Sequence, residues 1–261
     1  MVQPGVPVIL GQFAMRLAVI ADVHSNLEAL ESVLAALQAE GVGAVLNLGD
    51  LVGYGASPNE CLKMLTNSYY LNLAGNHDLA LLSPEKAEYF NIIAYQALMW
   101  QREVVQPEYR EFLQGLPLTR GMPGKFLACH GTPTSAEAYI THHFQGKKVL
   151  AELSRGGGPR VCFFGHTHRR ALWYRDIRGK VARLEISRPQ VFLEAEGHYL
   201  INPGSVGQPR DGNPQAAYAV FDPEEFSIHF KSTAYDIPGA QRRILQAGLP
   251  PFLAERLAQG I

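Results

Sequence analysis

The first two thirds of the sequence alternate short apolar runs with helical patterns, and this alternation limits the fold more than any other feature. Residues 16–22, 44–50 and 69–75 are short, apolar and typical of β-strands. Between the first two runs, residues 26–41 carry leucines at helical spacing and end at Gly41, a residue type that commonly closes a helix. Residues 57–65 open with Ser-Pro and a glutamate at the third helical position, a capping-box pattern that predicts another helix.

The rest of the chain changes character twice. Residues 83–116 look mainly helical, and the strand-like runs 124–131 and 160–166 follow, with a helical pattern at 136–154 between them. From Ala171 onward, five strand-like runs follow one another without long helices, and residues 238–260 return to a helical pattern. We predict an α/β fold with two mixed β-sheets packed face to face and helices on the outside, an α-β-β-α sandwich in which the late strands form the second sheet.

No linker divides the sequence, so we expect a single domain over residues 1–261. Within it, residues 1–14 are expected to be disordered or extended, and residues 79–120 to form a helical insertion beside the active site. Met15 directly precedes the first strand-like run, which leaves both Met1 and Met15 open as the translation start.

Composition excludes several classes of protein. The chain is 47% hydrophobic and 18% charged, with a formal net charge of -1, so a surface that tracks long nucleic acid is disfavoured. No apolar stretch reaches the roughly 18 to 20 residues that span a bilayer, and residues 1–14 lack the pattern of a signal peptide. We expect a cytoplasmic protein without a membrane partner, whose three cysteines are reduced core residues.

Polar side chains follow each strand-like run of the first 168 residues. In an open α/β sheet the ligand crevice lies beyond the carboxyl ends of the strands, which is where these side chains should gather. Successive runs are followed by Asp22 and His24, by Asp50, by Asn76, His77 and Asp78, by His130, and by His166 and His168.

This donor set indicates a metal centre. Carboxylate, imidazole and carboxamide groups without thiolates suit Mn²⁺, iron and Zn²⁺. Seven of these residues are too many for one ion but fit two ions about 3.5 to 4 Å apart that share a carboxylate, an arrangement that clamps a phosphoryl group: Asp22, His24, Asp50, Asn76, His130, His166 and His168. His77 is left over and could serve as the proton donor to a leaving group.

The motifs DVHSN, GDLVGYG, GNHD, CHG and GHTH, in this order, resemble those of the calcineurin-like metallophosphoesterase superfamily. The segment NPGSVGQPRDGNPQAAYAVFD is similar to the small bacterial phosphodiesterase branch, so the resemblance covers most of the chain. It implies a hydrolase of phosphate esters that uses two divalent metal ions and a metal-bridging hydroxide as nucleophile.

The resemblance also implies a role for each matching position. Asp22, His24 and His168 would hold the first metal, and Asn76, His130 and His166 the second, with Asp50 bridging both. His77 would contact the phosphate or protonate the leaving oxygen, and Asp78 would orient the His77 ring.

The substrate class is the open question. Protein phosphatases of the superfamily carry arginines after the GD and GNH motifs, whereas this chain has GDLVGYG and GNHDLALL there, which favours a phosphodiesterase. The alternatives are a phosphomonoesterase, a nucleotide or protein phosphatase, or a catalytically silent scaffold of the same fold. We expect a small phosphoester or nucleotide-like substrate.

A few further residues are weighed as substrate contacts. Besides Asn76, we predict that Arg210, in a Gly/Pro-rich loop, and Tyr54 contact the substrate at the rim. His142 and His143 do not follow a strand and are not expected to bind metal, and Arg169 and Arg170 are assigned to a solvated turn. The C-terminal helical segment serves internal packing or forms a homo-oligomer face.

Overall fold

The computed structural model describes residues 15–67, 69–122 and 126–261; the expectation for residues 1–14 concerns residues outside this range. The strands are Leu17–Ile20 (β1), Ala44–Asn47 (β2), Tyr70–Asn72 (β3), Thr119–Met122 (β4), Phe126–Cys129 (β5), Val161–Phe163 (β6), Ala171–Arg175 (β7), Val181–Leu184 (β8), Gln190–Phe192 (β9), His198–Asn202 (β10), Ala216–Asp222 (β11) and Ser227–Thr233 (β12). The α-helices are Leu27–Glu40 (α1), Pro58–Leu65 (α2), Asn76–Leu82 (α3), Ile92–Val104 (α4), Pro107–Gln114 (α5), His143–Leu153 (α6), Ile237–Gln246 (α7) and Pro251–Glu255 (α8).

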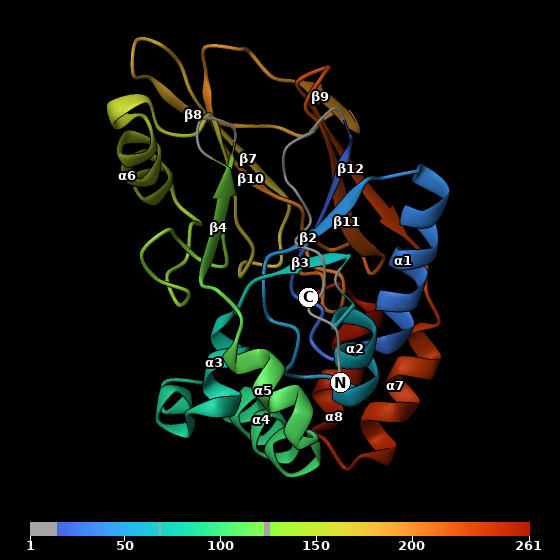
Figure 1. Ribbon diagram of the computed structural model, residues 1–261. Helices are drawn as coiled ribbons and strands as arrows, with labels where there is room; N and C mark the ends of the chain where they lie inside the picture. The colour runs from blue at the N-terminus through green and yellow to red at the C-terminus, as the bar shows by residue number, and fades with distance from the viewer. Residues whose placement is uncertain (1–14, 68, 123–125) are drawn as a thin grey trace, which may run out of the picture.

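The strands form two mixed six-stranded sheets, which confirms the predicted sandwich. Their orders are β3-β2-β1-β11-β12-β9 and β4-β5-β6-β10-β7-β8. In Figure 1, α1 covers one sheet and α7 lies beside α1, α6 lies outside the other sheet, and α3, α4 and α5 gather at one end. None of the helices in the described ranges is long and apolar enough to cross a membrane.

Side-chain alternation along the strands builds the layers. In β1, Leu17 and Val19 point into the core between the two sheets, whereas Ala18 and Ile20 point toward the helices. On the other sheet Phe163 faces the first sheet, and its neighbour Cys162 faces α6. This period of two is why short, continuously apolar runs are buried on both faces.

The prediction that the late strands form the second sheet is correct for β7, β8 and β10 and wrong for β9, β11 and β12. β11 pairs antiparallel with β1, and β12 and β9 extend the first sheet. β5 and β6, which come earlier in the chain, are parallel to β10 in the other sheet. Tertiary packing determines which strands pair. All buried strands have a similar apolar pattern, so the pattern does not identify the partner of a given strand.

Several predicted boundaries also differ from the structure. The helix expected over residues 136–154 begins only at His143; residues 132–135 form a bridged turn, and residues 136–142 are irregular. The sequence pattern does not predict β4 or β8, and β4 includes residues 119 and 120, which the pattern places in the helical insertion. α2 begins after Ser57 as predicted, but the Ser57 side chain makes no capping hydrogen bond.

Parallel pairing aligns the ends of the early strands. β1, β2 and β3 run parallel in one sheet, and β5 and β6 run parallel in the other. Their carboxyl ends therefore meet at one edge of the sandwich, where the loops that follow them carry the predicted ligands.

Candidate metal centre

Both sheets contribute side chains to one buried site. The loops after β1, β2 and β3 supply Asp22 and His24, Asp50, and Asn76, the first residue of α3. The loops after β5 and β6 in the other sheet supply three imidazoles, those of His130, His166 and His168. All seven side chains are buried, with exposed fractions between 0 and 7%.

Six of the seven residues predicted as ligands lie in two overlapping clusters. Asp22, His24, Asp50 and His168 form one, and Asp50, His130 and His166 form the other; within each, the donor atoms lie within 4.8 Å of one another. Asp50 belongs to both. Asn76 adjoins the second cluster, with Oδ1 3.1 Å from Nε2 of His130.

Five of these residues have a left-handed backbone, which is uncommon outside glycine. The φ angles are 55° for Asp22, 48° for His24, 55° for Asp50, 65° for His166 and 56° for His168. Such strain costs about 1–3 kcal/mol per residue and is typical of functional sites. Here it turns the chain sharply at the end of each strand, so that the next side chain points into the site.

Backbone carbonyls orient the imidazole rings. Because a carbonyl can only accept, Nδ1 of His24 donates to Val52 (2.8 Å), Nδ1 of His130 to Leu48 (2.9 Å) and Nδ1 of His168 to Gln208 (2.7 Å). Nε2 of each ring is thereby directed at the clusters. This outer hydrogen bond fixes the tautomer, as is usual for metal-binding histidines.

His166 has the opposite orientation. Its Nε2 donates to the carbonyl of Glu137 (3.1 Å), which leaves Nδ1 as the donor atom for a metal.

The arrangement fits a cation and is unfavourable without one. Nε2 of His24 and Nε2 of His168 lie 3.1 Å apart, and in the neutral rings both carry lone pairs, since the protons are on Nδ1. Oδ2 of Asp22 is buried and has no hydrogen-bond partner among the described residues. A divalent cation would satisfy all three atoms at once.

Burial and charge shift the pKa values of these groups in opposite directions. Burial raises the pKa of Asp22 to about 7 and lowers the pKa of His166 to about 3. Burial would also raise the pKa of Asp50, but His130 and His77 outweigh it and hold that pKa well below its usual range. For His130 burial acts downward, yet Asp50 and Asp22 raise the pKa to about 9.

Glycine is required where two loops meet at Asp50. A Cβ atom on Gly75 would lie 2.1 Å from Oδ1 of Asp50 and 2.3 Å from its backbone nitrogen. The backbone N–H of His77 donates to the same Oδ1 (2.9 Å), so the start of α3 holds the shared carboxylate in place.

The expected contact between Asp78 and the His77 ring is not made. Asp78 instead accepts three backbone N–H groups, from Leu51 (2.9 Å), Val52 (3.1 Å) and Gly75 (2.8 Å), and so joins α3 to the loop after Asp50. Nδ1 of His77 is buried without a partner among the described residues. The His77 ring is positioned by packing against the rings of Tyr54 (4.7 Å) and Phe90 (4.5 Å); burial lowers its pKa to about 4.

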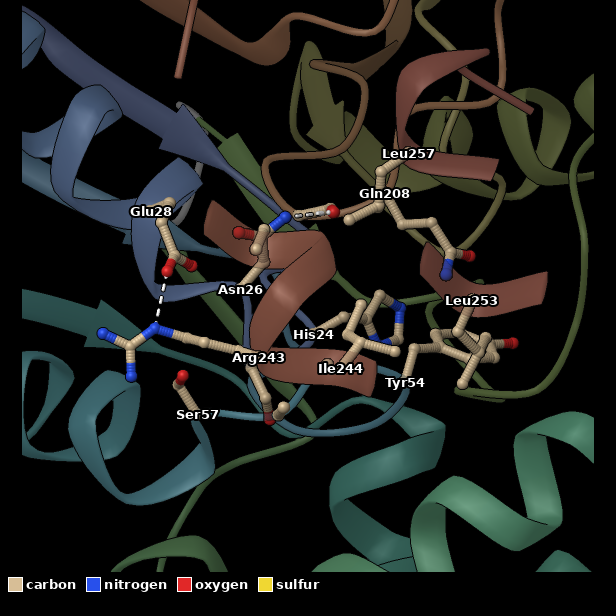
Figure 2. A pocket seen from close by; sticks show the side chains of 15 residues that line it. His24, Asn26, Glu28, Tyr54, Ser57, Gln208, Arg243, Ile244, Leu253 and Leu257 are labelled. Atoms are coloured by element: carbon tan, nitrogen blue, oxygen red, sulfur yellow. Dashed lines mark hydrogen bonds and ion pairs between the residues drawn. The ribbon is translucent and has the colours of Figure 1, made fainter. Parts of the chain in front are cut away.

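The predicted rim residues lie beside the centre. The guanidinium of Arg210 stands 5.6 Å from the Tyr54 ring centroid and donates to Gln208 Oε1. Its positive charge contributes to lowering the pKa values of His24, His77 and His168, after burial in each case. Figure 2 shows Ile244 beside His24 and Leu253 beside Tyr54, so the C-terminal helices pack against this part of the site.

Two polar side chains hold the turns beside the clusters. Nδ2 of Asn202 donates to the carbonyl of Gly165 (2.7 Å), and Oγ of Ser205 donates to the carbonyl of Asp22 (2.8 Å), so each holds a turn that carries residues of the clusters. Neither His142 nor His143 belongs to a cluster, and Arg170 pairs with Asp211 (3.1 Å). The three cysteines, all in described parts of the chain, are buried free thiols.

Sequence reasoning missed two residues of the site. Gln101 is fully buried in α4 and bonds to both loops that carry His24 and Asp50. The sequence feature that could have identified Gln101 is its spacing: it lies on the same helix face as the buried Ala94, Ala97 and Leu98. Tyr139, whose ring centroid lies 3.9 Å from that of His166, lies in an irregular segment with no such signal.

Fold and site together define the class of protein. Residues 15–225 match the calcineurin-like phosphoesterase superfamily domain. The chain belongs to this superfamily, as the order of its motifs implied.

Relatives cover nearly the whole chain. The uncharacterized protein MJ0912 of Methanocaldococcus jannaschii is 36% identical over 247 residues, 94% of this chain and 98% of that protein. Phosphodiesterase YfcE of Escherichia coli is 26% identical over 216 residues, 82% of this chain and 91% of YfcE. The crystal structure of a metallophosphoesterase from Sphaerobacter thermophilus covers 95% of this chain and 100% of its own, with 34% identity and a TM-score of 0.80.

Proposed function

We propose that this protein is a phosphodiesterase that depends on two divalent metal ions, with Mn²⁺, Fe or Zn²⁺ as the fitting choices. The observation that carries the proposal is the pair of buried clusters that share Asp50. The lack of arginine after the GD and GNH motifs supports a diester over a dianionic monoester, and similarity to the phosphodiesterase YfcE supports the same class.

In this proposal Asp22, His24 and His168 hold one ion, Asn76, His130 and His166 hold the other, and Asp50 contacts both. Bound divalent cations would lower the pKa of water and offset charge on the phosphoryl oxygens. Mn²⁺, iron and Zn²⁺ share these nitrogen and oxygen ligands, so the side chains alone do not select among them.

The chain's own groups position the ester. His77 borders both clusters and a cavity of about 500 Å³, where its ring can contact a phosphoryl oxygen or pass a proton to the leaving oxygen. Arg210 uses two of its N–H bonds on Gln208, which fixes the guanidinium beside Tyr54 and leaves other donors for an anion. A cytoplasmic location and a homo-oligomeric state stay predictions.

The test is hydrolysis by protein stripped of metal and reconstituted separately with Mn²⁺, Fe²⁺ and Zn²⁺. We expect bis(p-nitrophenyl) phosphate to be hydrolysed with a higher kcat/KM than p-nitrophenyl phosphate, and metal analysis to give two ions per chain. His130→Asn should lose activity, whereas His143→Asn, a change at an exposed histidine outside the clusters, should not. A preference for the monoester would contradict the diester assignment, and no activity with any of these metals would contradict the whole proposal.

A further inference from the structure

A cavity of about 500 Å³ opens directly beside the metal centre. Asn76, His77 and His166 form one side of it, and residues from the start of α4, the preceding 3-10 turn (Pro84–Ala87) and the irregular segment before α6 form the rest. Its volume is in the range of pockets that bind small organic molecules and is far larger than a phosphoryl group requires. One ester group of the substrate therefore has a place to bind.

Aromatic rings dominate this cavity. Tyr54, Tyr89, Phe90 and Tyr139 all line it. Tyr139 is 48% exposed and Tyr89 is 93% exposed, the highest exposed fraction of any large hydrophobic side chain in the described ranges. Because an aromatic ring gains little from lying in water, two such rings at the mouth of a pocket indicate surfaces that stack on a flat ligand.

Polar groups complement the rings. Oδ1 of Asn91 caps α4 by accepting from Ala94 (3.0 Å), which leaves its Nδ2 group free to donate. Glu85 and Glu137 add carboxylate acceptors, and Lys86 adds one cation, so this cavity has no net positive charge for a second phosphate. The positive charge of Arg210 is instead felt at the metal centre.

We propose that this cavity binds a nucleobase, stacked on Tyr89 and Tyr139 with its edge facing the polar groups, and that the substrate is a phosphodiester of a nucleoside. The inference rests on the proposed function for its chemistry, but base binding stands independently of it. A nucleobase has two flat faces, a hydrogen-bonding edge and no charge, and the rings and polar groups of this cavity match these properties. Aromatic side chains stack on every base.

The first experiment compares two diesters that release the same chromophore, adenosine 5′-(p-nitrophenyl) phosphate and methyl p-nitrophenyl phosphate, on the Mn²⁺-reconstituted protein. We expect kcat/KM to be about tenfold higher for the adenosine ester, which corresponds to about 1.4 kcal/mol. Tyr89→Ala should abolish most of this ratio, and Tyr89→Phe should keep it. Tyr69→Ala, a change at an exposed tyrosine far from the cavity, is the matched control and should leave both rates unchanged.

The second experiment measures binding without catalysis, by calorimetry of adenosine and of ribose with the metal-free protein. We expect adenosine to bind and ribose not to bind, and Tyr89→Ala to weaken adenosine binding. Hydrolysis of both diesters within twofold of each other, or adenosine binding that Tyr89→Ala leaves unchanged, would overturn the inference. Adenosine binding that depends on Tyr89 in a protein that hydrolyses no ester would instead overturn the proposed function and leave the base site standing.

Discussion

Gln101 gives the sharpest test of how the fold supports the metal centre. Its Oε1 accepts from the backbone N–H of Gly53 (2.6 Å), and its Nε2 donates to the carbonyl of Gly55 (2.7 Å) and to Oγ of Ser25 (3.0 Å). One side chain from α4 thus joins the loop after His24 to the loop after Asp50.

We expect Gln101→Met, which keeps the length of the side chain, to remove all three hydrogen bonds with little loss of volume. Each buried backbone group that is left without a hydrogen-bond partner lowers the free energy of unfolding by about 1–3 kcal/mol. The unpaired N–H of Gly53 and the unpaired carbonyl of Gly55 should therefore lower it by about 2–6 kcal/mol together. This loss is a large share of the free energy of unfolding of a typical domain, which is roughly 5–15 kcal/mol. Since the carbonyl of Val52 in the same loop orients His24, Mn²⁺ affinity should also fall, by about tenfold.

Urea unfolding of the metal-free protein measures the first effect, and Mn²⁺ titration by calorimetry measures the second. Gln114→Met, at an exposed glutamine in α5, is the matched control and should change neither quantity. If Gln101→Met stays within about 0.5 kcal/mol of the parent protein and binds Mn²⁺ equally well, Gln101 does not hold the loops.

Three more predictions test the proposed metal site. Asp50→Asn should lower activity by at least about 100-fold and reduce the bound metal measured by elemental analysis. The control Asp222→Asn should change neither quantity. Full activity of Asp50→Asn with two ions bound would contradict the assignment of Asp50 as the shared ligand. Gly75→Ala should destabilise the protein and reduce its metal content, because the new Cβ would lie 2.1 Å from Oδ1 of Asp50. The control Gly115→Ala, whose Cβ would lie 3.5 Å from its nearest neighbour, should leave the stability measured by urea unfolding unchanged. Equal stability of the two variants would show that the loop can move aside. Mn²⁺ at about 100 times its Kd should stabilise the stripped protein by about 2.7 kcal/mol in thermal unfolding, reversibly with chelator, and an unchanged melting curve would count against a preformed metal site.

The proposed ligand residues could be predicted from the sequence because each one comes within a few residues of the end of a strand. A buried strand has a clear apolar pattern, and parallel strands end at the same edge of a sheet, so the residues after Ile20 and Asn47 lie close together in one sheet, as do those after Cys129 and Phe163 in the other. Only the packing of the two sheets brings these two sets to one site. Gln101 could in principle be recognised as the polar member of a buried helix face. Its hydrogen-bond partners could not be predicted, because they lie in loops far from it in the sequence.

The sequence by itself determined the alternation of strands and helices, the position of the candidate site at the strand ends and the carboxylate, imidazole and carboxamide groups that the site contains. Those features depend on side-chain type and local spacing, which are written in the chain. Only the tertiary structure decided that β11 pairs with β1, that Asp78 binds backbone rather than the His77 ring, and that Tyr139 lies on His166. These contacts involve backbone groups that every residue carries, or segments far apart in the chain, so no local pattern distinguishes the right partner from the wrong ones.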